Sequence, residues 1–209
     1  MSWNVVNLSE LESFPVGERG LLWHPIRSRL GIEAFGINAY TAAEVGGEVV
    51  EEHTEESLGH EEIYIVIGGH ATFTLDGEEV DAPTGTIVHL PDPPVKRTAV
   101  ALEPGTTVLA VGGKRGEAFT PSAWEVWFRA EHLPPGEAVT LVEGFTAEHP
   151  ENVAALYNLA CFRMRAGDGD GALDAFRRSF ELDPDRVRTW SAADEDLDPI
   201  RAEVSAITG

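Results

Sequence analysis

The chain has 209 residues, enough for one sizeable domain or two small ones. It carries 15 Lys and Arg residues against 36 Asp and Glu residues, a formal net charge of −21. This charge repels phosphate backbones and anionic lipids, so we expect neither nucleic acid nor a membrane surface as a partner. The sequence predicts no secretion leader and no apolar run long enough to cross a membrane, so we expect a cytoplasmic protein.

Short strands separated by turns are predicted over roughly the first 115 residues. Apolar or alternating runs occupy 20–26, 32–42, 47–53, 62–69, 70–83, 85–91, 95–102 and 106–113. Asp76-Gly77 is a hairpin signal, because Gly accepts a positive φ and Asp bonds to its own backbone. Many short strands at regular spacing favour a sandwich or a barrel.

The pattern changes near residue 121. Residues 122–133 could form a helix or an amphipathic cover strand, and Pro134 and Pro135 then interrupt the chain. From residue 137 onward the apolar spacing is helical. We therefore predict a β-rich domain at 1–133 and a helical domain at 137–209. Cys161 lies in an apolar part of the helical region, where a buried structural thiol is expected.

Small and bulky residues follow a fixed order along the helical region from 153 to about 186. They are Leu156, Leu159, Ala160, Gly167, Ala172, Phe176 and Ser179. The order resembles a tetratricopeptide repeat, a helix–turn–helix unit, with a departure at Arg163, where the repeat usually has an aromatic residue. One and a half repeats cannot bury a solenoid core alone. We therefore expect this segment, about 137–190, to pack on the β-rich domain or on a second chain. A peptide-binding groove is the alternative.

A glutamate-rich stretch with two histidines runs directly into the apolar strand near residue 62. Residues two apart on a strand share a face, so His53 and Glu55 point the same way, as do His60 and Glu62. Two imidazoles with one or two carboxylates suit Fe, Mn, Ni or Zn. We predict these four residues as candidate ligands of a divalent metal at the mouth of a barrel. Alternatively, they are ordinary residues of a charged loop.

The same region is similar to the two short motifs of the cupin superfamily. Glu62, its apolar strand and the closing Gly69 match the first motif, while Glu55 stands where the second histidine of the H-x-H pair is usual. The resemblance covers about 35–115. It implies a double-stranded β-helix, or jelly-roll, barrel. The expected fold is therefore β-rich α+β, a cupin-like barrel followed by a small all-α tetratricopeptide-like region. It also implies a homodimer.

In the second motif, "GTIVHLPDPPVK", Gly85 and Pro91 match and Lys96 occupies the place of the histidine. A lysine there would repel a divalent metal, pair with a carboxylate or bind an anionic ligand. Its neighbour Arg97 is then expected on the opposite, solvated face. We predict Lys96, Tyr64 and His89 as ligand-binding residues, with Tyr64 or Lys96 orienting a substrate or moving a proton.

Three functions remain open from the sequence. The first is a module that binds or senses a small polar or anionic molecule, with or without a metal, while the helical tail contacts a protein partner. The second is a metal-dependent cupin enzyme of the dioxygenase or isomerase type. The third is a structural dimer. The sequence contains no nucleophile elbow, Walker loop or dinucleotide fingerprint.

Overall fold

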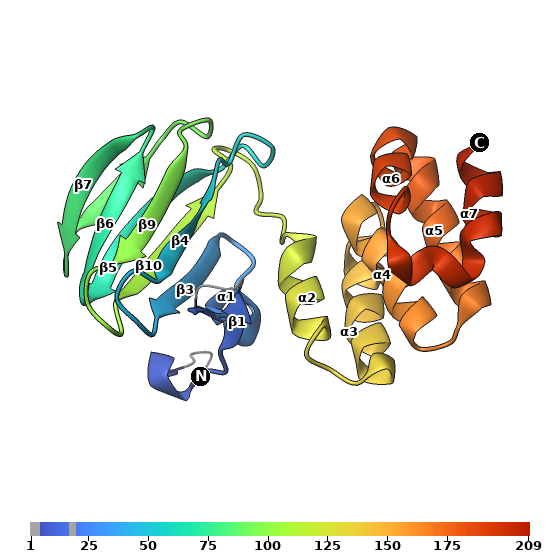
Figure 1. Ribbon diagram of the computed structural model, residues 1–209, viewed down its shortest axis with the longest axis horizontal. Coiled ribbons are helices and arrows are strands. Elements are labelled where there is room, and N and C mark those ends of the chain that lie inside the picture. Colours follow the sequence, from blue (N-terminus) through green and yellow to red (C-terminus); the bar gives the residue numbers. More distant parts are fainter. Residues whose placement is uncertain (1–4, 17–19) are drawn as a thin grey trace. The chain divides into compact units, whose positions relative to one another are not determined.

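The computed structural model describes residues 5–16 and 20–209, and the chain divides into two compact units, Met1–Pro121 and Ser122–Gly209 (Figure 1). The first unit is β-rich. Its elements are η1 (Leu8–Glu10), β1 (Phe14–Val16), β2 (Leu21–His24), α1 (Ile26–Leu30), β3 (Gly36–Ala42), β4 (Glu48–His53), β5 (Glu61–Gly68), β6 (His70–Leu75), β7 (Glu78–Pro83), β8 (Ile87–Leu90), β9 (Arg97–Ala101) and β10 (Thr107–Gly113). Each segment predicted as a strand overlaps at least one of these strands.

The first unit is a jelly roll. Its larger sheet has the order β1-β2-β3-β10-β5-β8, and its smaller sheet has the order β4-β9-β6-β7, with every pairing antiparallel. The chain therefore passes between the two sheets several times from β3 to β10, which is the double Greek-key arrangement. In Figure 1 the smaller sheet lies in front, with β5 and β10 behind it.

The core of the first unit lies between its two sheets. In β6, Ala71 and Phe73 are buried while the intervening Thr72 is only partly covered, as the period of two requires. Residues of β4, β5, β9 and β10 complete the same apolar cluster. The predicted hairpin is confirmed, because Asp76 and Gly77 both have positive φ and join β6 to β7.

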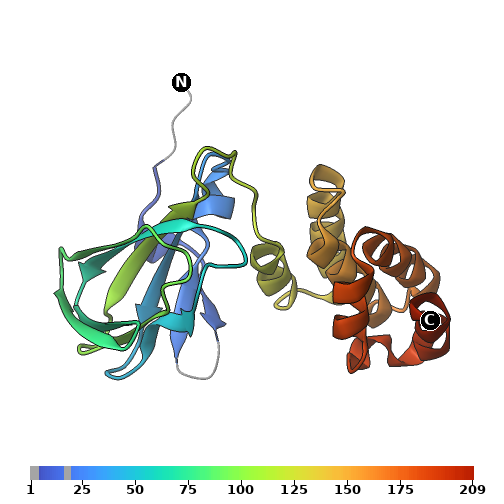
Figure 2. The same ribbon diagram turned by 90° about the horizontal axis from the view of Figure 1, so that it is seen from above.

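The second unit is helical. Its elements are α2 (Ala123–Ala130), α3 (Pro135–Glu148), α4 (Val153–Arg165), α5 (Gly169–Leu182), α6 (Pro184–Ser191), η2 (Glu195–Ile200) and α7 (Arg201–Thr208). Figure 1 and Figure 2 show α3, α4 and α5 side by side. Within the part of the chain that the structure describes, none of the helices has the length and apolar character needed to span a bilayer.

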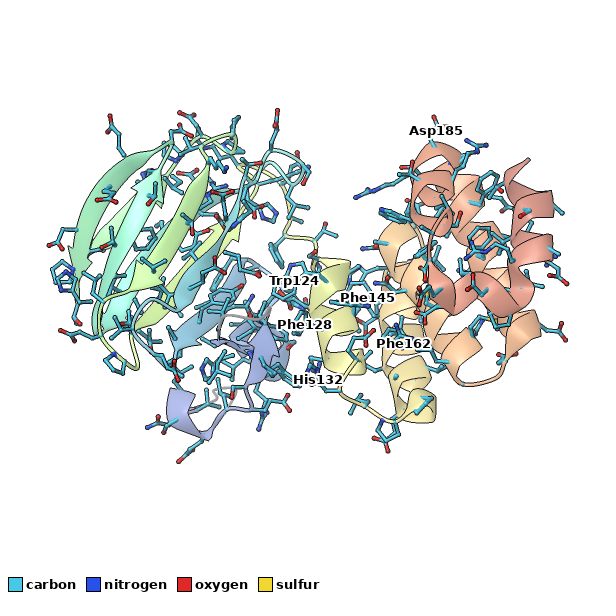
Figure 3. The ribbon with its side chains drawn as sticks, in the orientation of Figure 1. Trp124, Phe128, His132, Phe145, Phe162 and Asp185 are labelled. Carbon is cyan, nitrogen blue, oxygen red and sulfur yellow. The ribbon has the colours of Figure 1, made fainter. Side chains whose placement is uncertain are left out.

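Helix α2 corrects the domain boundary expected at 133–137. Val126 and Ala130 of α2 belong to the same apolar core as α3, α4 and α5, so the chain divides between Pro121 and Ser122 instead. Pro134 and Pro135 begin α3 without ending the unit, since proline suits the first turn of a helix. Trp124 and Phe128 follow one another along a different side of α2, and His132 continues the row just beyond the end of the helix (Figure 3).

Helices α4 and α5 pack closely because small residues lie between them. Ala160, Ala172 and Ser179 are fully buried, and the hydroxyl of Ser179 donates to the carbonyl of Val153 (2.9 Å). Gly167 has φ 83° and ends α4, where a Cβ would be strained. The interface therefore has the small residues that close helix packing requires.

Arg163 of α4 has a structural partner on each side. Its Nη1 donates to the carbonyl of Gly171 in α5 (2.8 Å), and its Nη2 donates to Glu143 of α3 (2.7 Å). An aromatic residue could make neither bond. Arg163 thus joins three helices through hydrogen bonds at the position where the repeat usually has an aromatic ring.

Candidate functional site

Six polar side chains meet at one end of the jelly-roll strands. They are His53, Glu55, His60, Glu62, Tyr64 and Arg97, from the end of β4, the loop after it, the start of β5 and the start of β9. The Cα register places His53 opposite Arg97. Residues more than forty positions apart in the sequence therefore form one cluster, called here the polar cluster.

The four predicted metal ligands all belong to the polar cluster. His53 Nε2 lies 3.6 Å from Glu55 Oε1, and His60 Nδ1 lies 3.2 Å from Glu55 Oε2. Three ligand atoms, one each from His53, Glu55 and Glu62, lie within 4.8 Å of one another. These three therefore form the compact donor group, and His60 adjoins it through Glu55.

Tyr64 fixes the carboxylate of Glu62. Its hydroxyl donates to Glu62 Oε2 (2.6 Å) and lies 3.5 Å from His53 Nε2. Burial raises the pKa of Glu62; the Tyr64 hydrogen bond lowers it, the nearby charge of Glu55 raises it further, and Arg97 and His53 lower it. Burial, reinforced by Glu62, raises the pKa of Tyr64 well above its ordinary value. Tyr64 therefore stays a hydrogen-bond donor.

The cation of the polar cluster is Arg97, not Lys96 as predicted. Lys96 Nζ binds Glu52 Oε1 (2.7 Å) at the surface, where the two side chains are 56% and 58% exposed. Arg97 is completely buried, with Nη2 3.8 Å from Glu62 Oε2 and Nη1 donating to the carbonyl of Pro93 (3.4 Å). The prediction that Arg97 is solvated on the opposite face is also wrong.

Arg97 rather than Lys96 faces the cluster because inward and outward residues alternate along β9. Arg97, Ala99 and Ala101 are buried, whereas Thr98 and Val100 are only partly covered, so odd-numbered residues face the core. Counting residues forward from Gly85 and Pro91 of the motif placed Lys96 in the cluster. That count was off by one residue, because the proline-rich turn after β8 sets where β9 begins. Counting back from the small residues Ala101 and Ala99 would have identified Arg97.

Three buried polar atoms of the polar cluster lack hydrogen-bond partners among the described residues. They are Arg97 Nε, Arg97 Nη2 and Glu55 Oε2. Although His60 Nδ1 is close to Glu55 Oε2, the two atoms do not form a hydrogen bond. Such atoms are costly to bury, and an ion, a water molecule or a ligand is their usual explanation.

His89 lies outside the polar cluster. In β8 it alternates with the buried Val88 and Leu90 and therefore points away from the core. Its Nε2 binds Glu61 Oε1 (2.6 Å), and Glu61 also accepts a hydrogen bond from Arg115. Arg115, followed by His89, lowers the pKa of Glu61. His89 thus makes a hydrogen bond to a surface carboxylate.

A second set of close ligand atoms lies in the helical unit, at Cys161, Asp194 and Asp196. These groups already have partners. The Tyr157 hydroxyl donates to Asp194 (2.7 Å), and Arg165 binds Asp196 through several hydrogen bonds. Burial, followed by Asp194, raises the pKa of the Cys161 thiol, which is buried as predicted. This cluster stabilises the helical unit from within.

No known family model and no curated protein matches the chain. A sugar phosphate isomerase of the cupin superfamily from Silicibacter pomeroyi is similar at 18% identity over 53% of this chain and 76% of its own, with a TM-score of 0.44. KdgF from Halomonas sp. is similar at 19% identity over 59% of this chain and 99% of its own, with a TM-score of 0.44. An RmlC-like cupin from Shewanella frigidimarina is similar at 17% identity over 55% of this chain and 95% of its own, with a TM-score of 0.41.

These low identities and TM-scores add nothing to the fold assignment, which follows from strand order and register. The first unit is a jelly roll with a polar cluster at one end of its strands. That architecture occurs in cupins and in other classes of protein, so it does not by itself define a reaction.

Replacing Arg97 should affect stability far more than replacing Lys96. We expect Arg97→Ala to lower the free energy of unfolding by about 3 kcal/mol, because it leaves buried carboxylates without their cation. Lys96→Ala should cost less than about 1 kcal/mol, because its ion pair is exposed. Urea denaturation followed by circular dichroism measures both, and equal losses would contradict the assignment of Arg97 to the cluster.

Proposed function

We propose that the first unit is a cupin-type domain that binds a small polar molecule at the polar cluster, with a divalent transition metal held by His53, Glu55 and Glu62. The observation that carries this proposal is that one ligand atom of each lies within 4.8 Å of the others. The unpartnered, buried Glu55 Oε2 supports it as well. A mixed set of imidazole and carboxylate ligands suits Fe, Mn, Ni or Zn.

The remaining members of the cluster would support the donor group. Tyr64 holds Glu62 in place through its short hydrogen bond, as partners of metal ligands commonly do. His60 would act on the site through Glu55. A metal bound here would supply an electrophilic centre for an oxygen atom of the ligand.

The alternative is a metal-dependent cupin enzyme of the dioxygenase or isomerase type, with His53, Glu55, His60 and Glu62 as ligands. The short hydrogen bond from the Tyr64 hydroxyl to Glu62 favours this alternative. A buried carboxylate joined to a hydroxyl donor is typical of acid–base sites. Tyr64 would then move or hold the proton.

The helical unit is, in this proposal, a tetratricopeptide-like helix pair that serves as a packing appendage or contacts a protein partner. The fully buried Ala160, Ala172 and Ser179 support the assignment of α4 and α5, as does Gly167 in the turn between them. The exposed Leu182 near the end of α5 offers a position at which an interface can be tested.

A second copy of the chain is the proposed occupant of an aliphatic face on the outer side of the larger sheet. The face consists of Ile63, Ile65 and Ile67 of β5, Ile87 of β8, and Leu109 and Val111 of β10. Glu61, two residues before Ile63 in β5, forms an ion pair with Arg115 and a hydrogen bond with His89. Two chains of charge −21 can approach where charge is neutralised, and an aliphatic face is complementary to itself about a two-fold axis.

The metal proposal predicts about one transition metal per chain. Elemental analysis of protein purified without chelator or affinity tag measures this content. We expect Glu62→Gln to lose most of the metal, because it removes a donor oxygen and a charge, and the exposed Glu56→Gln to keep it. Absence of metal after addition of Fe, Mn, Ni and Zn in turn would overturn the proposal.

The enzyme alternative is tested on the metal-loaded protein. Proton NMR with small hydroxy acids and polyols in deuterated water detects turnover or exchange of carbon-bound protons. If the alternative is correct, Tyr64→Phe should slow the reaction by about 100-fold, because the proton carrier is lost. Binding of these compounds with neither turnover nor exchange would favour the binding proposal instead.

The dimer proposal predicts that light scattering gives twice the mass of one chain, which is 22.6 kDa. Ile87→Asp should give single chains, because it places a charge on the aliphatic face. Val45→Asp is the matched control, since Ile87 and Val45 are 63% and 61% exposed. If Leu182→Asp separates the chains and Ile87→Asp does not, the helical unit and not the sheet forms the interface.

A further inference from the structure

We propose that the polar cluster binds its metal together with a small monoanion, and that Arg97 makes the two binding events interdependent. This inference rests on the proposed metal site. It names the class of the second ligand, a small molecule with a carboxylate or a similar singly charged group. It also assigns a task to a residue that the metal itself does not need.

Arg97 is a fixed part of the cluster. Its side chain is completely buried, and its Nη2 lies 3.8 Å from Glu62 Oε2. The carbonyl of Pro93 accepts from Nη1 and holds the guanidinium from the other side. Because β9 begins at Arg97 and its next inward residue, Ala99, is fully buried, the side chain cannot turn toward solvent without disrupting the strand.

The charges of the cluster require an anion once a metal is present. Glu55 and Glu62 bring two negative charges, and Arg97 brings one positive charge. A divalent metal would leave one residual positive charge if the imidazoles and the Tyr64 hydroxyl are neutral. An unbalanced charge in a poorly solvated site is costly, and a monoanion removes it.

The unpartnered atoms of Arg97 have the matching chemistry. Nε and Nη2 both lack acceptors among the described residues, and together they form the edge of a guanidinium that binds carboxylates through two parallel hydrogen bonds. Nη2 is the atom nearest Glu62, so this edge lies beside the donor group. Other cations of this region are engaged at the surface: Lys96 by Glu52, Arg115 by Glu61 and Lys114 by Glu117.

His53 is the most open of the three ligands. Its side chain is 35% exposed, compared with 11% for Glu55 and 12% for Glu62. A small ligand can therefore approach from the His53 side, while Arg97 lies at the closed side. This arrangement favours a compact monoanion over a large or highly charged molecule.

The test measures zinc affinity of the full, metal-stripped wild-type chain by calorimetry. The two buffers contain acetate or the uncharged isostere acetamide at equal ionic strength. We expect acetate to tighten zinc binding by about 10-fold, a common strength of coupling between two ligands. Acetate complexes zinc weakly in solution, an effect of the opposite sign, so tighter binding cannot arise from the buffer.

Variants identify Arg97 as the source of the coupling. Arg97→Met should bind zinc about 10-fold more tightly in acetamide, because a nearby positive charge is gone, and should lose the acetate effect. Arg97→Lys should retain part of the effect, and Lys96→Met should behave as the wild type. If Arg97→Met does not fold, the wild-type comparison still decides the question.

The outcomes separate the two proposals. Zinc binding of equal affinity in acetate and acetamide would overturn the inference and leave the metal site standing. An acetate effect that persists unchanged in Arg97→Met would overturn the assignment to Arg97. If no zinc binds in either buffer, the proposed metal site fails, and this inference fails with it.

Discussion

The buried contact between Arg97 and Glu62 is the constraint on which the polar end of the jelly roll depends. Two carboxylates and two imidazoles are otherwise costly to withdraw from water, and a fixed cation from a third strand offsets part of that cost. β4 and β9 pair through their backbones, whereas β5 belongs to the other sheet and is joined to β9 here by the Arg97–Glu62 contact. Stability and chemistry therefore depend on the same side chains.

Much of the β-rich unit could be predicted from local signals. Alternation and turn residues such as Asp76-Gly77 located the strands, because one buried face and a positive φ leave clear marks in a sequence. The end of the unit was harder to predict. Pro134 and Pro135 suggested a boundary, yet α2 belongs with the later helices because Val126 and Ala130 need their apolar cover.

The candidate site was predictable where its residues are close in sequence. His53, Glu55, His60 and Glu62 fall within ten positions, and the loop that joins β4 to β5 brings them together. The partner from β9 is Arg97, and its neighbour Lys96 was predicted instead, because a one-residue shift of register moves every side chain to the other face. Whether the site holds a metal stays a prediction, since spacing alone cannot weigh the charge of Arg97 against that of an ion.

The division at Pro121 has an evolutionary consequence. Every member of the polar cluster and both sheets precede it, while all helices from α2 onward follow it. Each unit has its own apolar core, so a substitution in one core does not change the residues of the other. Substitutions in the polar cluster and substitutions in the helical core would fall on separate stretches of the gene. A recombination event between the codons for Pro121 and Ser122 would join intact cores rather than halves of one.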